Sequence, residues 1–204
     1  MAITVDFEYH KPDSIDTLVR LLERYKDKAS ILAGGTDLVN ALKDQSVVPE
    51  VVLDIKGIEE LSEIILKDGR LFIGAAVTFA DLIESEIIKE KFPLLSEAAA
   101  TVGSVGVRNR GTMVGNICNA VPSCDLSTPV LVYDATIITE SVDGKRNIPA
   151  VEWFKAPRKT DRGVHEVVTG ISFTLPEKKH ASCYVKLGRY RGEDLAQAGL
   201  SVLM

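Results

Sequence analysis

"ILAGGTDLVNALK", residues 31–43, decides the fold. It reads as a short apolar strand, a turn of two glycines, and a helix that begins near Leu38. Two glycines let backbone N–H groups approach a ligand without hindrance from Cβ, and the helix start adds free N–H groups and a positive dipole end. This arrangement suits a phosphate, although paired glycines also form ordinary tight turns. The stretch matches neither a P-loop nor the G-x-G-x-x-G fingerprint, which disfavours both of those sites.

The flanking residues extend this stretch to a β-α-β-α-β unit. Asp13 or Ser14 can cap a helix whose apolar residues recur at i, i+3, i+4 and i+7, namely Ile15, Leu18, Val19 and Leu22. After Pro49, the apolar run "VVLDI" at residues 51–55 predicts a second buried strand. The unit ends near Lys56, after which the pattern changes.

The following residues, to about Pro176, predict an α+β arrangement. Asp68-Gly69 and Asp143-Gly144 each separate two β-type runs, which indicates two hairpins. Two helices between these hairpins have start or stop signals at Thr78, Asp81, Pro93 and Gly103. Strands joined by hairpins, with helices packed to one side, are typical of an α+β lobe.

The final stretch, residues 180–204, predicts two strands around a polar connection, and the sequence stops inside the second apolar run. Because a strand seldom ends a domain without a partner, we expect the chain to be truncated or to be completed by another polypeptide.

Composition excludes several classes of protein. With 204 residues, 46% apolar and 26% charged, the chain has the composition of a folded protein. A net charge of −5 and a pI near 5.3 argue against nonspecific nucleic-acid binding, and basic residues form only a modest cluster at residues 155–162. No apolar run is long enough for a membrane span, and the N-terminus has no secretory signal pattern, so we expect a cytoplasmic protein without membrane insertion.

The cysteines and histidines do not predict a metal site. Three cysteines, Cys118, Cys124 and Cys183, are too few for a disulfide framework, and none forms a C-x-x-C pair. Buried thiols are therefore favoured over metal ligands. The histidines, His10, His165 and His180, are isolated in sequence, which favours surface or turn positions.

A second informative stretch runs from Thr101 to Val130, "TVGSVGVRNRGTMVGNICNAVPSCDLSTPV". It places four glycines among small polar residues. Two such loops could clamp a diphosphate between two lobes, whereas the alternative is a long surface loop. The length of the stretch and its few charges favour an ordered functional loop.

Three motifs in order carry a resemblance to a known family. "AGGTDL" at residues 33–38, "VRNRGTMVGNICNAVPSCDL" at 107–126 and "YVKLGRYRGEDLA" at 184–196 resemble the FAD-binding subunit of the molybdenum hydroxylases. That family includes xanthine, carbon monoxide and nicotinate dehydrogenases and 4-hydroxybenzoyl-CoA reductase. The resemblance runs from "FEYHKPDSIDTLVRLL" at residues 7–22 nearly to the last residue.

The resemblance implies an α+β, two-lobed FAD-binding fold of the vanillyl-alcohol oxidase (PCMH-like) type. Residues 1–56 would form the N-terminal lobe, residues 57–175 the second lobe, and residues 176–204 the start of an incomplete C-terminal domain. The first loop would wrap the FAD diphosphate with Ile31, Leu32, Ala33, Gly34, Gly35, Thr36, Asp37 and Leu38. The second loop would support it from the facing lobe with Thr112, Met113, Val114, Gly115 and Asn116. Further cofactor-contacting positions would be Gly103, Asp125, Arg162, Ile171 and Lys186.

Some of these residues have an equally simple structural role. Asp125 suits a hydroxyl or a flavin N–H donor, or it could cap the helix "LSTPVLVY". Lys186 could stabilise charge on the reduced flavin, or it could be an ordinary exposed strand lysine. Asp37 could cap the helix at Leu38 rather than touch a ligand, because its charge would oppose a diphosphate.

The chain departs from the family pattern at one glycine position. The family has T-I/V-G-G-N where this chain has Thr112-Met113-Val114-Gly115-Asn116. If the position of Val114 needs a positive φ, a β-branched residue is costly there, so either the loop conformation is milder here or flavin affinity is reduced.

The function implied by the resemblance is electron relay. A molybdopterin-binding large subunit would oxidise the substrate, a small subunit with two [2Fe-2S] clusters would pass single electrons, and FAD on this chain would deliver them to NAD+ or another acceptor. We expect no catalytic acid–base pair, no nucleophile and no metal site in this chain. Two other classes stay open: a self-sufficient flavin oxidoreductase, and a non-catalytic interaction protein that has lost flavin.

Overall fold

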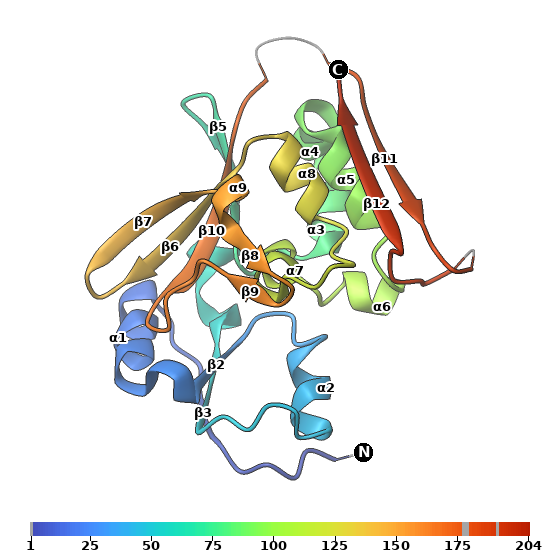
Figure 1. The fold of residues 1–204 in the computed structure, drawn as a ribbon. Coiled ribbons are helices and arrows are strands. Elements are labelled where there is room, and N and C mark those ends of the chain that lie inside the picture. Colours follow the sequence, from blue (N-terminus) through green and yellow to red (C-terminus); the bar gives the residue numbers. More distant parts are fainter. Residues whose placement is uncertain (1, 177–179, 191) are drawn as a thin grey trace.

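The computed structural model describes residues 2–176, 180–190 and 192–204, which form two larger sheets, a small two-stranded ribbon and a terminal hairpin (Figure 1). The first sheet is parallel and has the order β1-β3-β2. Its elements in chain order are β1 (Glu8–His10), α1 (Ile15–Tyr25), β2 (Ala29–Leu32), α2 (Leu38–Lys43) and β3 (Val51–Asp54). The predicted β-α-β-α-β unit is therefore confirmed. All four residues of the central strand β3 are buried, as expected for an uninterrupted apolar run.

Helix α1 joins the first sheet to the second. Ser14 is its N-cap, and the Ser14 hydroxyl accepts a hydrogen bond from the backbone N–H of Thr17. The apolar stripe of the helix is buried and lies against strands β6 (Thr136–Ser141) and β10 (Val167–Thr174) of the second sheet. One hydrophobic core consequently extends through both parts of the molecule.

The second sheet is antiparallel and has the order β4-β5-β10-β6-β7. Its other strands are β4 (Ile64–Lys67), β5 (Arg70–Gly74) and β7 (Gly144–Pro149). Strand β10 is central, and seven of its eight residues are buried. Both predicted hairpins are present. Asp68 and Gly69 have φ of 50° and 72°, and a two-residue type I′ hairpin turn requires positive φ at both of these positions. In the second hairpin Ser141 pairs with Gly144, so the loop is Val142-Asp143, one residue earlier than predicted.

Short helices cover one side of this sheet. They are α3 (Phe79–Glu84), α4 (Glu86–Lys91), α5 (Pro93–Ala100), α6 (Val105–Arg108), α7 (Met113–Asn119), α8 (Ser127–Val132) and α9 (Ala150–Trp153). The capping box of Thr78 and Asp81 is confirmed, as is Pro93 at the first position of α5. Helix α5 ends at Ala100, so Gly103 lies beyond it in a left-handed conformation with φ of 43°. Single turns of 3-10 helix lie at Lys26–Lys28, Ile55–Gly57 and Glu59–Ser62, and β8 (Phe154–Ala156) pairs with β9 (Lys159–Thr160).

The last element is an antiparallel hairpin of β11 (Ser182–Leu187) and β12 (Ala198–Leu203). It packs against α5 and α8 at the opposite side of the second sheet from α1 (Figure 1). Tyr184, Lys186 and Ser201 face inward, whereas Val185 and Leu200 are exposed. The two predicted strands are confirmed. Among the described residues, no helix combines the length and the apolar character needed to cross a membrane.

Candidate functional site between the glycine turn and helix α7

The glycine turn after β2 lies directly against the segment that precedes α7. A Cβ on Gly34 would be 2.0 Å from the carbonyl oxygen of Arg110 and 2.8 Å from the Cα of Gly111. Only a residue without a side chain permits this approach of two backbones. The structure therefore brings together the two glycine-rich loops that the sequence singled out.

The turn also leaves backbone donors unused. Gly35 adopts φ of +78°, and its carbonyl accepts from the N–H of Val39 at the start of α2. Within the described parts of the chain, the N–H groups of Thr36, Asp37 and Leu38 donate to no protein acceptor. Asp37 occupies the N-cap position, but its side chain makes no capping hydrogen bond, so the capping alternative is wrong. Three donors at a helix start are thus available for an anionic group.

The second loop is held by its own hydrogen bonds. The Thr112 hydroxyl caps α7 by accepting from the N–H of Gly115 at 3.0 Å. Backbone bonds from Phe79 N–H to the Gly111 carbonyl (3.0 Å) and from Met113 N–H to the Val77 carbonyl (3.3 Å) fix the segment to the second sheet's helices. Met113 and Val114 are buried, so these side chains belong to the core.

Val114 carries no backbone strain. It lies in the first turn of α7, and its φ is not positive. The positive-φ condition under which valine would be costly is not met, which agrees with a milder loop conformation; the effect of Val114 on flavin affinity stays a prediction. Asn116, two residues further along, accepts from the Cys124 thiol at 2.9 Å and from the N–H of Leu126 at 3.4 Å. These bonds tie α7 to the turn before α8.

A small pocket of about 50 Å³ lies where the two loops meet. Its lining residues are Ala33, Gly34, Lys56, Ala76, Thr78, Asn109, Arg110 and Thr112. The sequence prediction included three of them and missed Lys56, Thr78, Asn109 and Arg110 among the polar ones. Asn109 and Arg110 lie inside the quoted second loop, so their place in that loop was the available signal. Thr78 was noted only as a helix cap, and Lys56 had no local signal.

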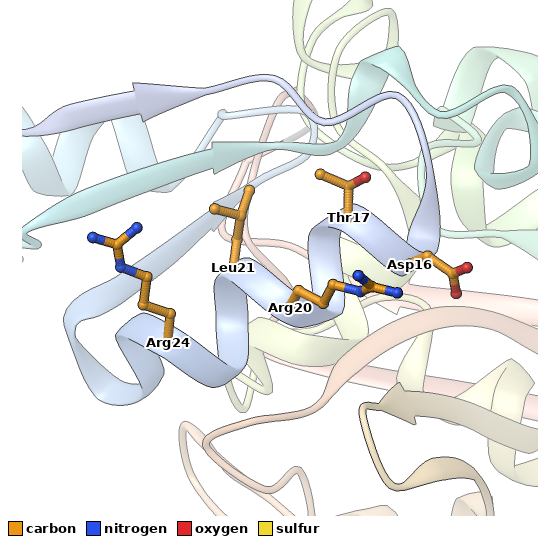
Figure 2. A pocket seen from close by; sticks show the side chains of 5 residues that line it. All are labelled: Asp16, Thr17, Arg20, Leu21 and Arg24. Atoms are coloured by element: carbon orange, nitrogen blue, oxygen red, sulfur yellow. The ribbon is translucent and has the colours of Figure 1, made fainter.

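A larger hollow of about 560 Å³ lies on the exposed face of α1 (Figure 2). Figure 2 shows that Asp16, Thr17, Arg20, Leu21 and Arg24 all project from this one helix. None of them is a predicted site residue, and the hollow shares no lining residue with the pocket at the glycine turn. The candidate site is the smaller pocket.

Asp125 and Lys186 form a buried ion pair. Lys186 Nζ is 3.1 Å from Asp125 Oδ2 and donates to the Thr101 carbonyl at 2.9 Å. The Tyr184 hydroxyl donates to Asp125 Oδ1 at 2.7 Å, and burial together with this bond raises the pKa of Tyr184. Lys186 is thus not an ordinary exposed lysine. The helix-cap alternative for Asp125 is also wrong, since α8 begins after Leu126 without a side-chain cap.

The remaining predicted residues do not gather at the pocket. Arg162 Nη1 donates to the Glu166 carbonyl at 2.7 Å. Ile171 is fully buried in β10, where it pairs with Ile73 on one side and Ile137 on the other. Gly103 lies beside Val107, and its carbonyl accepts from Arg108 at 2.8 Å. Their role at the site stays a prediction.

The carboxylate of Glu166 is expected to make the free energy of unfolding depend on pH. The Arg146 guanidinium bonds both carboxylate oxygens of Glu166, at 2.8 and 2.7 Å, and holds the pKa of that carboxyl below its usual value of 4.5. A lowered pKa contributes stability that is present above the unfolded value and is lost as pH falls through the folded value. We expect the free energy of unfolding to fall below about pH 4.5, and Glu166→Gln to flatten this slope in urea titrations at several pH values. An unchanged slope in the variant would assign the acid sensitivity to other carboxylates.

The thiols of Cys118, half-buried in α7, and Cys124, buried in the turn that follows, are expected to react slowly. Burial raises the pKa of the thiols of Cys118 and Cys124 to about 12, whereas Cys183 is exposed. We therefore expect iodoacetamide at pH 8 to label Cys183 alone in the native protein and all three thiols after denaturation, as measured by intact mass. Rapid native labelling of Cys124 would contradict the buried position of this turn.

No group of three or more metal-binding side chains occurs in the part of the chain that the structure describes.

The chain is similar in sequence to proteins of a known family. Residues 5–177 match the family model described as FAD binding domain in molybdopterin dehydrogenase. The glyceraldehyde dehydrogenase medium chain of Sulfolobus acidocaldarius is 33% identical over 198 residues, which is 97% of this chain and 70% of that protein. The carbon monoxide dehydrogenase medium chain of Hydrogenophaga pseudoflava is 35% identical, with 97% of this chain and 69% of that protein covered.

Solved structures agree with these sequence relatives. A carbon monoxide dehydrogenase from Hydrogenophaga pseudoflava, which lacks the Mo-pyranopterin moiety of its cofactor, superimposes with a TM-score of 0.95 at 35% identity, over 100% of this chain and 70% of that one. Quinoline 2-oxidoreductase from Pseudomonas putida 86 superimposes with a TM-score of 0.92 at 27% identity, over 98% of this chain and 69% of that one.

Proposed function

Because the chain belongs to the FAD-binding domain family of the molybdopterin dehydrogenases, we propose that it relays electrons from partner [2Fe-2S] clusters to NAD+ or another acceptor. The FAD cofactor, the oxidoreductase class and the molybdenum hydroxylase family predicted from the sequence are confirmed by these matches. The match over residues 5–177, which contain both glycine-rich loops, is the observation that carries the proposal.

The residues present fit FAD. A diphosphate needs clustered N–H donors and a close backbone approach, and the turn offers the free donors of Thr36, Asp37 and Leu38. Gly34 leaves no Cβ between the two loops, and Lys56 and Arg110 line the adjoining pocket. Asp37 fits only if its carboxylate points away from the phosphates.

The chain's own residues would bind and orient the cofactor. The first loop would hold the diphosphate through backbone N–H groups, and Thr112 to Asn116 would support it from the facing side. When bound, FAD supplies the ability to take up electrons singly and to release two. The buried pair of Lys186 and Asp125 would place a fixed charge arrangement near the flavin, while Gly103, Arg162 and Ile171 would supply the remaining contacts.

The fold proposal follows the same reasoning. We take the two sheets as the two lobes of a vanillyl-alcohol oxidase type fold, divided near residue 56, with the hairpin β11–β12 as the start of a further C-terminal domain. The parallel three-stranded sheet, the antiparallel five-stranded sheet and the separate hairpin support this division.

The proposed partners are a molybdopterin-binding large subunit and a small [2Fe-2S] subunit. The relatives' names support this, since they are described as medium chains or FAD subunits of dehydrogenases. The self-sufficient flavin enzyme and the interaction protein without flavin gain no support. The two sequence relatives named above are medium chains, and the backbone strain at Val114 that would suggest a lost flavin is absent.

The test is affinity purification of the tagged chain from its native host, followed by analysis of flavin, molybdenum and iron. The proposal predicts FAD together with molybdenum and iron in fixed ratio to the chain. FAD without either metal would contradict the relay and favour a self-sufficient flavin enzyme.

A further inference from the structure

Lys56 makes two contacts that connect the end of β3 to the glycine turn. Its ammonium nitrogen lies 2.7 Å from Asp54 Oδ1 and donates to the carbonyl of Ala33 at 3.1 Å. Ala33 immediately precedes Gly34, the residue that touches the second loop. The lysine thus reaches across the sheet edge to the first peptide of the turn.

This contact fixes the direction of a backbone donor. In a trans peptide the carbonyl and the N–H point in opposite directions, and every peptide bond among the described residues is trans. Because Lys56 holds the Ala33 carbonyl, the Gly34 N–H is aimed away from Lys56. A rotation of this peptide would move both the N–H and the following glycines.

The partner of the partly exposed Lys56 side chain, Asp54, is itself held in place. Asp54 is 4% exposed and accepts from the Tyr9 hydroxyl at 2.5 Å and from the backbone N–H of Lys56 at 3.0 Å. Burial opposes ionisation of Asp54, but the hydrogen bonds from Lys56 and Tyr9 prevail and lower the pKa of its carboxyl. The carboxylate therefore anchors the ammonium group of Lys56.

We propose that Lys56 is a positioning residue for FAD: anchored by Asp54, it holds the Ala33 carbonyl and so sets the orientation in which the glycine turn presents its N–H groups. The inference rests on the proposed function, because it concerns the same loop. Lys56 belongs to no glycine-rich or capping motif in the sequence. Its proposed role is to orient the backbone of the glycine turn rather than to pair with a phosphate charge.

Tyr9 provides a matched control. Lys56→Met removes the bond to Ala33 and one partner of Asp54, whereas Tyr9→Phe removes a partner of Asp54 and leaves the Ala33 carbonyl bonded. Lys56→Arg keeps a cationic donor of similar reach. The measurement is the Kd of each apo-protein for FAD by quenching of flavin fluorescence, together with thermal unfolding of the apo-proteins.

We expect Lys56→Met to weaken FAD binding about tenfold, as loss of one charge-assisted hydrogen bond allows. Lys56→Arg should recover most of the affinity. Tyr9→Phe should bind FAD as tightly as the wild type does, even if its unfolding temperature falls as much as that of Lys56→Met. The ratio of the Lys56→Met and wild-type Kd values should be the same at low and high salt, because a positioning role is not screened.

Three results would overturn the inference: an unchanged Kd in Lys56→Met, an equal loss in Tyr9→Phe, or a ratio that collapses at high salt, which would indicate direct pairing with phosphate. A wild-type chain that binds no FAD would overturn the proposed function as well. Wild-type binding with an unaffected Lys56→Met variant would overturn the role of Lys56 alone, so the two failures are distinguishable.

Discussion

Gly34→Ala is expected to remove FAD from the protein. The new Cβ would lie 2.0 Å from the Arg110 carbonyl oxygen and 2.7 Å from its carbonyl carbon, both of them backbone atoms that cannot rotate away. The glycine turn would have to separate from the second loop, and the diphosphate donors would move with it. Since overpacking of this kind costs about 1–3 kcal/mol or more, we expect FAD affinity to fall about a hundredfold.

Gly106→Ala is the matched control for this variant. Gly106 lies in α6, next to the same segment, and its added Cβ would meet only the Ser104 hydroxyl, at 3.7 Å. Flavin content per chain, read from visible absorbance after gel filtration, should be lost in Gly34→Ala and kept in Gly106→Ala. Equal flavin content in the two variants would sink the assignment of this contact.

Lys186→Met is expected to have the largest effect on stability. Lys186 and Asp125 are 10% and 6% exposed in their side chains, so removal of the lysine leaves a buried carboxylate with the Tyr184 hydroxyl as its remaining side-chain donor. Breaking one partner of a buried pair costs about 3–5 kcal/mol. The free energy of unfolding from urea denaturation should fall by that amount, and the double variant Lys186→Met with Asp125→Asn should regain a large part of it. A double variant no more stable than the single one would mean that the pair is not coupled.

The double variant also tests the cofactor role of the pair. If Lys186 lies near the flavin, replacement of the pair by neutral residues should shift the flavin midpoint potential while the flavin stays bound. An unchanged potential would leave Lys186 with a structural role only, namely joining β11 to the Thr101 carbonyl and Asp125.

The sequence predicted those parts of the fold that short-range rules determine. Ser14 at the helix start, the Thr78 capping box and the Asp68-Gly69 turn each depend on residues within three positions, and all are present. The hairpin loop at Val142-Asp143 was misplaced by one residue because Gly144 begins a strand rather than completing the turn.

The site was predictable only in outline. Both glycine-rich loops were identified, but not the contact between them, which joins Gly34 to Arg110. The burial of Lys186 depends on Asp125, which is 61 positions away in sequence. Lys56 reaches Ala33 across 23 positions, and nothing local distinguishes it from a surface lysine. Such contacts join elements that are far apart in the sequence, and periodicity and capping patterns do not specify them.

The visible spectrum of the purified chain, before and after addition of a chemical reductant, tests the central claim most directly. The account predicts an oxidised flavin spectrum at about one FAD per chain, which bleaches on reduction. A colourless protein that takes up no added FAD would contradict the assignment of the glycine turn and the α7 segment as a flavin site.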